Sequence, residues 1–387
     1  MSDAQTNIVD STFQYVPSPR LRGMFDLSGQ PQLNLNERQR NGLADLRAAI
    51  DSGKIVLEDV DTCLCGERER VQISSHERWG LPLGAYCCIK CGLIYTSPRI
   101  AEESLYSYYH DYYQNIQLAE PPTKDTILFR EGQGTKIFQL FQPRIASGTT
   151  SLKVLDIGCA MGSVIKEFAL AARKAGISVE GVGYDYNQEF LDAFDSEGLN
   201  IRVLNGGIAE AAEANLHPDL VVMSHVFEHY NHPGVPLTSL KRILREDAMV
   251  YIEVPGVLDL QRRQEYNFDW LSYVTCSHPY HYNLISLTEL LNRDGFTLVW
   301  GNETVESFFR LGDQSMEIEG NARRVLTFLE EIEYTKWFLI QMNDLQHRSD
   351  RHDQRLSRID DHIQRLNDSG VSFIARNVAA IKRRLFG

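Results

Sequence analysis

Short apolar runs alternate with amphipathic stretches between residues 153 and 300. Runs such as KVLDIG and GVGYD are each followed by a segment with apolar residues at helical spacing, such as VIKEFALAARKAG. Strands that alternate with helices in this way pack as a parallel sheet with helices on both faces. The pattern predicts an open, doubly wound α/β domain at 151–320.

The segments that flank this domain follow other patterns. Residues 35–50 place Leu43, Leu46 and Ile50 at helical spacing, and 101–150 contain a tyrosine-rich helix and a second helical stretch. From residue 321 onward, apolar residues include the three-four spacing of a helical seam. We expect an N-terminal helical segment at 1–60, a helical connector at 101–150 and a C-terminal helical extension at 321–387 that serves a homo-oligomer.

Composition places the chain among folded globular proteins. Of its 387 residues, 43% are hydrophobic and 24% are charged, and the formal net charge of −13 opposes a nucleic-acid partner. The N-terminus lacks the basic and then apolar order of a secretory signal. The longest uncharged stretch, 270–288, contains histidines and a proline that a membrane-spanning helix tolerates poorly. We therefore expect a cytoplasmic protein without a transmembrane segment.

The last segment, 371–387, carries four basic side chains, no acidic one, and apolar residues at helical spacing. A helix of this kind lies on an anionic membrane surface, or its apolar stripe packs on a neighbouring subunit or on its own domain. The seam at 345–366 favours packing, because it already indicates helix pairing. Peripheral membrane contact is the alternative.

Five of the seven cysteines lie between Cys63 and Cys91. In a reducing compartment such a cluster suggests a metal before a disulfide, and Cys88-x-x-Cys91-Gly has the spacing of a zinc knuckle. Cys63 and Cys65 are separated by one residue instead of two to four, so Cys87 is an alternative to one of them. A buried group of reduced thiols is the competing interpretation. The predicted ligands of a structural zinc are Cys63, Cys65, Cys88 and Cys91.

A glycine-rich turn follows the first strand of the α/β domain. It reads Gly158-Cys-Ala160-Met-Gly162, and glycine lets a chain turn tightly while a ligand approaches the backbone. A dinucleotide fingerprint requires glycine where the chain has Ala160 and Ser163, and no Gly-Lys-Ser/Thr of a P-loop follows. Asp185 ends the next strand at about the spacing where a carboxylate meets ribose hydroxyls. Turn and carboxylate therefore fit a ligand with a ribose.

This turn and Asp185 resemble the first motif and the second strand of the class I S-adenosylmethionine-dependent methyltransferases. The stretches 219–233, with its Glu228-His229 pair, and 250–255, which ends in Val-Pro, resemble later strands of the same family. The resemblance implies a Rossmann-like fold and S-adenosylmethionine as the cofactor. The cofactor-binding residues that it implies are Asp156, Gly158, Ala160, Met161, Gly162, Asp185, Tyr186 and His225.

A cysteine ribbon at 61–100, a tyrosine-rich helix and a methyltransferase domain together resemble bacterial enzymes that methylate sugars. Those enzymes carry Tyr-His-Glu-His-Phe-Ser where this chain reads His278-Pro-Tyr280-His281-Tyr-Asn. The resemblance implies His281 as the catalytic base, and His225, His229 and His278 are the alternatives for this role. Because Tyr280 replaces the glutamate, transfer to a hydroxyl of a sugar or glycan is favoured over C-methylation of a nucleotide-linked ketosugar.

Three questions stay open at this level. The methyl acceptor is not fixed by any motif. Glu228 and His229 also resemble a residue pair that binds a divalent metal in some quinone-precursor O-methyltransferases, so a second metal is an open alternative. A noncatalytic, zinc-containing scaffold is the competing function, although the intact glycines and Asp185 speak against it.

Overall fold

The computed structural model describes residues 30–117, 132–314 and 318–333, together with 335, 336, 339, 340, 342 and 345. The chain divides into two compact units, Met1–Glu331 and Ile332–Gly387. Residues 321–333 are helical, as expected for the start of the C-terminal extension, and most of this helix belongs to the first unit. The segment 371–387, for which membrane or subunit contact is expected, lies outside the described residues.

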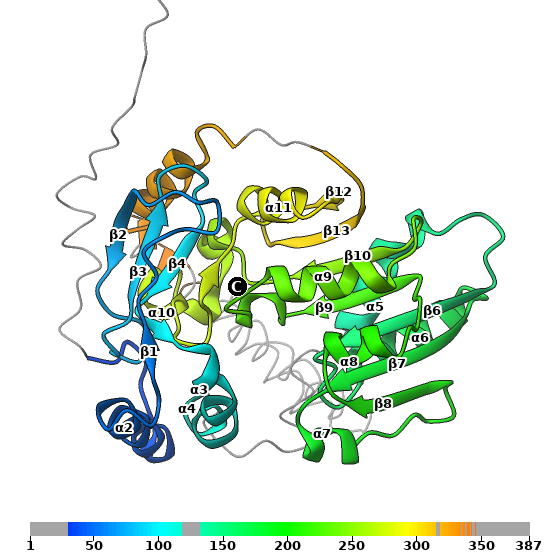
Figure 1. The fold of residues 1–387 in the computed structure, drawn as a ribbon, viewed down its shortest axis with the longest axis horizontal. Coiled ribbons are helices and arrows are strands. Elements are labelled where there is room, and N and C mark those ends of the chain that lie inside the picture. The colour runs from blue at the N-terminus through cyan, green and yellow to red at the C-terminus, as the bar shows by residue number, and fades with distance from the viewer. Residues whose placement is uncertain are drawn as a thin grey trace, which may run out of the picture. The chain divides into compact units, whose positions relative to one another are not determined.

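A seven-stranded sheet forms the centre of the first unit, in the order β12-β13-β10-β9-β6-β7-β8 (Figure 1). Strands β6 to β10 all pair in parallel, and the order changes direction at β6. This is the predicted doubly wound α/β sheet. Its strands are β6 Ser151–Ile157, β7 Ser178–Asp185, β8 Ile201–Asn205, β9 Leu220–Ser224, β10 Met249–Glu253, β12 Phe296–Gly301 and β13 Glu306–Leu311.

Strand β9 shows why helices cover both faces of this sheet. Side chains of a strand alternate between the two faces, and all five residues of β9 are buried. Leu220 and Val222 pack in one core with α5 and α6, whereas Val221 and Met223 pack in a second core with α8, α9 and α11. A continuous apolar run in the sequence thus marks a strand between two helical layers.

Strand β13 was not expected from the sequence, in which the last predicted strand ends at about residue 300. It runs antiparallel to both of its neighbours, β10 and β12. A short loop at 302–305 joins it to β12, so a hairpin adds the last strand without an intervening helix. The parallel pattern of strand and helix could not indicate such a strand.

The cysteine block forms a separate small sheet, in the order β11-β4-β3-β2 (Figure 1). Strands β2 to β4 are the antiparallel ribbon that the sequence predicts. The fourth strand, β11, comes from much later in the chain and pairs His281 with Ile94. The ribbon is therefore joined to the rest of the unit through a strand. The bounds of its strands are β2 Arg70–Ser74, β3 Gly84–Cys88, β4 Ile94–Ser97 and β11 Tyr280–His281. Two further strands, β1 Leu57–Glu58 and β5 Arg99–Ile100, pair with each other as a two-stranded antiparallel sheet.

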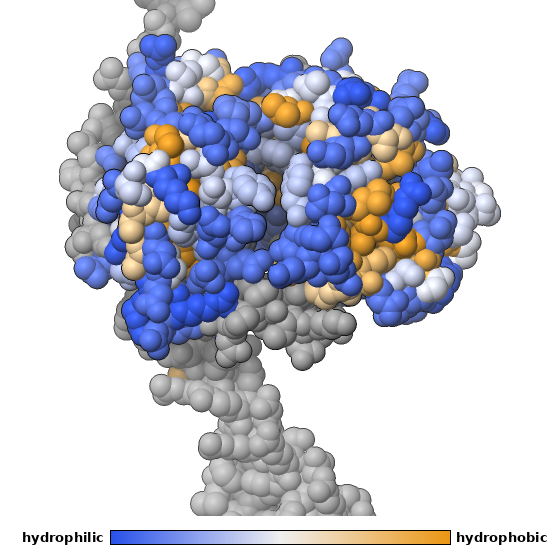
Figure 2. Space-filling view, turned by 60° about the horizontal axis from the view of Figure 1, so that its bottom comes forward, coloured by the Kyte–Doolittle hydropathy of each residue, from blue (hydrophilic) through white to orange (hydrophobic). Residues whose placement is uncertain are grey.

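Helices surround these two sheets, and the predicted amphipathic helix before the cysteines is α2. On the side seen in Figure 2 the surface is hollowed between the left-hand part, where the ribbon lies, and the right-hand part with the central sheet. The helices are α2 Glu37–Asp51, α3 Glu102–Ser107, η1 Tyr108–Tyr113, α4 Gln114–Gln117, α5 Gln133–Phe141, η3 Gln142–Arg144, α6 Ser163–Lys174, α7 Gln188–Asp192, α8 Ile208–Glu213, η4 Phe227–His229, α9 Gly234–Ile243, η5 Val257–Arg262, η6 Gln264–Tyr266, α10 Trp270–Tyr273 and α11 Leu284–Arg293.

A buried carboxyl group, that of Glu77, ties the loop after β2 to the segment before β11. Its oxygens accept the backbone N–H groups of Trp79, Leu81 and Cys276. Burial raises the pKa of Glu77 to about 7, although these donors lower it. The folded protein therefore holds this proton more tightly than the unfolded chain, whose glutamate pKa is about 4.3.

We expect the Glu77→Gln variant to lose a specific part of the pH dependence of folding. In the wild-type protein the contribution of Glu77 is complete below pH ~4.3 and is lost as the pH rises through about 7. Between pH 5 and 7 this amounts to about 2 kcal/mol. Urea unfolding at both pH values measures it, with the exposed Glu69→Gln as control. An equal pH dependence in wild type and Glu77→Gln would contradict the expectation.

Among the residues that the structure describes, no helix has the length and apolar character that a bilayer crossing requires.

Candidate active site and cysteine centre

The glycine-rich turn between β6 and α6 depends on left-handed backbone geometry. Gly158, Ala160 and Gly162 have φ values of 69°, 48° and 71°. The N–H of Gly158 donates to the carbonyl of Tyr184 at 2.8 Å, which ties the turn to β7. A Cβ atom on Gly158 would lie 2.5 Å from Cγ2 of Val226. Glycine at 158 thus satisfies both the left-handed conformation and a close approach to the segment after β9.

Asp185, at the end of β7, holds this turn directly. Its Oδ2 accepts the N–H of Ala160 at 2.9 Å, and its Oδ1 accepts the N–H of Asn187 at 2.8 Å. A carboxylate has about four acceptor sites, so these two bonds fix the side chain and leave capacity for ribose hydroxyls. The predicted turn and carboxylate therefore lie together, at the carboxyl ends of adjacent strands.

The other predicted cofactor residues differ in exposure. Asp156 is buried within β6, Met161 is partly exposed in the turn, and 69% of Tyr186 is exposed after β7. The hydroxyl of Tyr186 donates to Glu210 of α8 at 3.3 Å. The turn and the end of β9 flank the point where the strand order changes direction, which is where open α/β sheets bind ligands. The roles of Asp156, Met161 and Tyr186 in cofactor binding stay predictions.

We expect Asp185→Ala to weaken binding of S-adenosylmethionine at least tenfold. The substitution removes the acceptor for ribose hydroxyls and also releases the N–H of Ala160. Hydrogen bonds to a charged group contribute about 1.5–3 kcal/mol each. Titration calorimetry measures the effect, with the exposed Glu189→Ala in α7 as control. Unchanged affinity of the Asp185 variant would exclude this residue from the cofactor site.

His225, which follows β9, lies between two buried carboxyl groups. Its φ is 56°, and its Nδ1 lies 3.5 Å from Oε1 of Glu228. Its Nε2 lies 3.8 Å from Oε1 of Glu253 at the end of β10. Only 2% of the Glu228 side chain is exposed. Burial tends to raise the pKa of Glu228, but the hydrogen bond from His225 and the charge of His229 keep that pKa below its ordinary value.

Three histidine rings continue from Glu228 toward the ribbon. Nε2 of His229 lies 4.0 Å from Oε1 of Glu228, and the ring of His229 packs on His278 with centroids 4.9 Å apart. The centroids of His278 and His281 are 6.0 Å apart. The three predicted catalytic histidines, 225, 278 and 281, thus belong to one row of polar side chains that begins beside the cofactor turn.

His281 is at the ribbon end of this row. Only 1% of the residue is exposed, and neither ring nitrogen has a hydrogen-bond partner among the residues described. The rings of Trp270 and Tyr273 lie 5.4 and 5.3 Å from its own. Burial lowers the pKa of His281 to about 3, so the imidazole is neutral at neutral pH. Burial also places the pKa of His278 well below its usual value.

Sequence analysis did not identify Glu253, whose side chain accepts several hydrogen bonds at the end of β10. Its Oε2 accepts the hydroxyls of Ser224 at 3.0 Å and Tyr251 at 3.1 Å. The signal in the sequence was an acidic residue at the end of an apolar strand. In the tyrosine-rich helix, Tyr108 and Tyr112 are buried in the core with α2.

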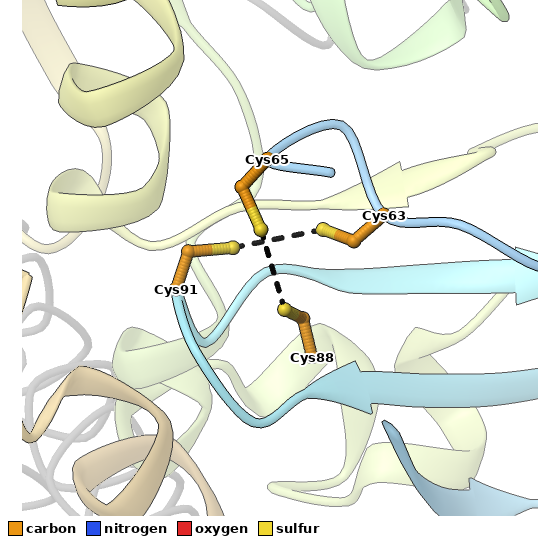
Figure 3. A group of neighbouring side chains, drawn as sticks. All are labelled: Cys63, Cys65, Cys88 and Cys91. Carbon is orange, nitrogen blue, oxygen red and sulfur yellow. Dashed lines mark hydrogen bonds between the residues drawn. The ribbon is translucent and has the colours of Figure 1, made fainter. Parts of the chain in front are cut away.

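The cysteine centre brings together the four predicted ligands (Figure 3). The sulfur atoms of Cys63 and Cys91 are 3.6 Å apart, and those of Cys65 and Cys88 are 3.5 Å apart. All four lie within 4.8 Å of one another. Sulfur atoms around a tetrahedral zinc with Zn–S bonds of about 2.3 Å are about 3.8 Å apart. The sulfur positions therefore fit one zinc ion.

Cys87, the alternative zinc ligand, does not face the centre that the other four cysteines form. It lies outside the group of four, and its Sγ contacts the carbonyl of Cys88 at 3.6 Å. Neighbouring residues of a strand point to opposite faces, so Cys87 and Cys88 cannot face the same centre. Burial also raises the pKa of the Cys87 thiol.

Comparison with known proteins agrees with this geometry. Residues 129–300 match a family model described as a methyltransferase domain. Over these residues the chain is similar to methyltransferase domains. The match and the sheet order confirm the predicted Rossmann-like methyltransferase fold, and the match supports methyl transfer from S-adenosylmethionine as the predicted activity. No curated protein matches the chain.

Solved structures of methyltransferases resemble the chain at low identity. Magnesium protoporphyrin IX methyltransferase from Synechocystis, solved with bound SAH, is 14% identical over 55% of this chain and 100% of its own, with a TM-score of 0.36. A plantazolicin methyltransferase is 15% identical over 60% of this chain and 88% of its own, with a TM-score of 0.39. A methyltransferase of calicheamicin biosynthesis is 16% identical over 54% and 61%, with a TM-score of 0.35.

Proposed function

We propose that the domain transfers the methyl group of S-adenosylmethionine to a hydroxyl of a sugar or glycan, with His281 as the base. The observation that carries this proposal is the buried imidazole of His281, whose ring nitrogens have no partner in the described part of the chain. A buried polar group without a partner costs free energy, so such a group is typical of a site that completes its contacts with substrate.

The chain's own residues would hold the cofactor at the carboxyl ends of β6, β7 and β9. The turn at 158–162 offers a backbone that a ligand can approach closely, and Asp185 offers acceptor positions for ribose hydroxyls. Bound S-adenosylmethionine supplies a methyl group that is already activated by its sulfonium. The protein therefore chiefly aligns the acceptor with the methyl carbon and excludes water.

His281 would accept the proton that the acceptor loses. As the hydroxyl oxygen forms its bond to the methyl carbon and the carbon–sulfur bond breaks, the proton passes from oxygen to a ring nitrogen of His281. The neutral state of His281 at neutral pH prepares it for this role.

The surroundings of Tyr280 favour oxygen over carbon as the acceptor atom. Its hydroxyl accepts from Arg99 at 2.8 Å and donates to the carbonyl of Asn231 at 3.1 Å. Tyr280 and His281 are neighbours in a strand, so their side chains point to opposite faces. The position that holds a glutamate in the sugar C-methyltransferases thus provides no carboxylate beside His281.

We also propose that the cysteine centre holds one structural zinc. Each cysteine pair lies in a turn closed by a glycine with positive φ, Gly66 after Cys65 and Gly92 after Cys91. Four thiolates fill a tetrahedral coordination sphere, so this zinc would stabilise the ribbon without binding the acceptor.

One experiment tests the proposed reaction. The full chain is incubated with methyl-labelled S-adenosylmethionine and pools of nucleotide sugars and glycans, and the products are analysed by mass spectrometry and NMR. A labelled methyl group on a sugar oxygen is the expected result. A label on carbon would establish the ketosugar alternative. Cofactor binding by calorimetry without any labelled sugar would reject this acceptor class, and absence of cofactor binding would favour the scaffold.

A further inference from the structure

A second group of metal-binding side chains lies apart from the cysteine centre. Glu228 and His229 follow β9, and His278 precedes β11; one ligand atom from each lies within 4.8 Å of the others. Two imidazoles and one carboxylate are a common ligand set for divalent transition metals such as zinc and iron. Three protein ligands leave coordination positions open for water or substrate.

Hydrogen-bonding contacts to Ser277 and Tyr109 orient the ring of His229 so that its other nitrogen can bind a metal. Its Nδ1 lies 3.0 Å from the carbonyl oxygen of Ser277 and 2.9 Å from the hydroxyl of Tyr109. A carbonyl can only accept, so Nδ1 carries the proton, and Nε2 is the nitrogen with the lone pair. Nε2 is the atom that lies 4.0 Å from Oε1 of Glu228. Metal-binding histidines almost always donate their other nitrogen to such an outer partner.

Glu228 supplies an independent observation. It is almost completely buried, and its Oε2 has no hydrogen-bond partner among the described residues. The contacts with His225 and His229 both involve the other oxygen, Oε1. A buried carboxylate needs a partner for each oxygen, and a bound cation would provide it.

We propose that Glu228, His229 and His278 hold one divalent transition-metal ion with an open coordination position near His281. In the proposed methyl transfer, an acceptor oxygen at that position would lose its proton more readily, because a bound cation stabilises the oxyanion. This role in the reaction rests on the proposed function. The binding of the metal does not.

The test uses Co²⁺ added to the full chain whose cysteine centre has been filled with zinc. We expect calorimetry to show one further equivalent of Co²⁺, with an absorption spectrum that lacks the intense thiolate charge-transfer bands. Glu228→Gln and His278→Gln should each weaken this binding at least tenfold. The exposed His232→Gln, from the same loop, should bind as the wild type does. Circular dichroism and cofactor titration check that each variant folds.

A measurement on the wild-type protein keeps the test independent of the variants. Bound Co²⁺ should shift the NMR signals of two histidine rings, including one exchangeable N–H from His229. No further equivalent of Co²⁺, no shifted imidazole signals, or variants with wild-type affinity would each overturn the proposal. Because Co²⁺ binding is measured without cofactor or acceptor, a failure here is distinct from a failure of methyl transfer.

Discussion

Cys91→Ser should abolish zinc binding and unfold the ribbon. Zinc binding contributes about 10–16 kcal/mol to the folding of zinc-finger peptides at pH 7, whereas whole domains are stable by only about 5–15 kcal/mol. Cys63, Cys88 and Cys91 are buried in the same core as the helices of one sheet face. Loss of the metal would therefore leave polar thiols in an apolar cluster and remove the cross-link between two turns.

Elemental analysis and thermal unfolding of protein purified without chelator measure this effect. Cys87→Ala is the matched control, because Cys87 is equally buried in β3 but lies outside the centre. We expect the control to retain its zinc and the Cys91 variant to lose it. A Cys91 variant with full metal content, or a control that loses its metal, would contradict the ligand set.

His281→Gln should lower the turnover number for methyl transfer by about 10²–10⁴-fold, the usual contribution of a general base. Glutamine fills similar space but cannot accept the proton. Affinity for S-adenosylmethionine should stay unchanged, because the cofactor turn and Asp185 belong to other elements. Turnover is measured with the labelled acceptor and affinity by calorimetry. The exposed His232→Gln is the control, and a fall of less than threefold for His281→Gln would remove it from the base role.

The pH profile gives a second measure of the same residue. A base must be deprotonated, so activity falls as the pH drops through its pKa. Burial lowers the pKa of His281 to about 3, so its protonation should not reduce kcat/KM of the free enzyme between pH 5 and 7. If His281→Gln abolished an inflection near pH 6.5, the ring would titrate as an exposed histidine does.

Local patterns in the sequence determined the central sheet and the cofactor turn. The apolar runs predicted β6 to β10 and β12, because a strand buried on both faces needs a continuous apolar segment. The glycine-rich turn could be predicted from the sequence because Gly158 and Gly162 have positive φ values, which residues with a side chain rarely adopt. The sequence also predicted the group of four cysteines, although the one-residue spacing of Cys63 and Cys65 left Cys87 as an alternative.

Only the tertiary structure decided where the candidate catalytic residues lie. His281 reaches its position because β11 pairs with β4, almost two hundred residues earlier in the chain. The contacts of Glu228, His229 and His278 bring together two loops that sequence spacing does not relate. Strand β13 also follows from pairing between distant segments. The spacing of apolar residues along the sequence shows which side of a helix or strand is buried. The contacts between these distant segments depend instead on the free energy of packing separate elements together, which that spacing does not contain.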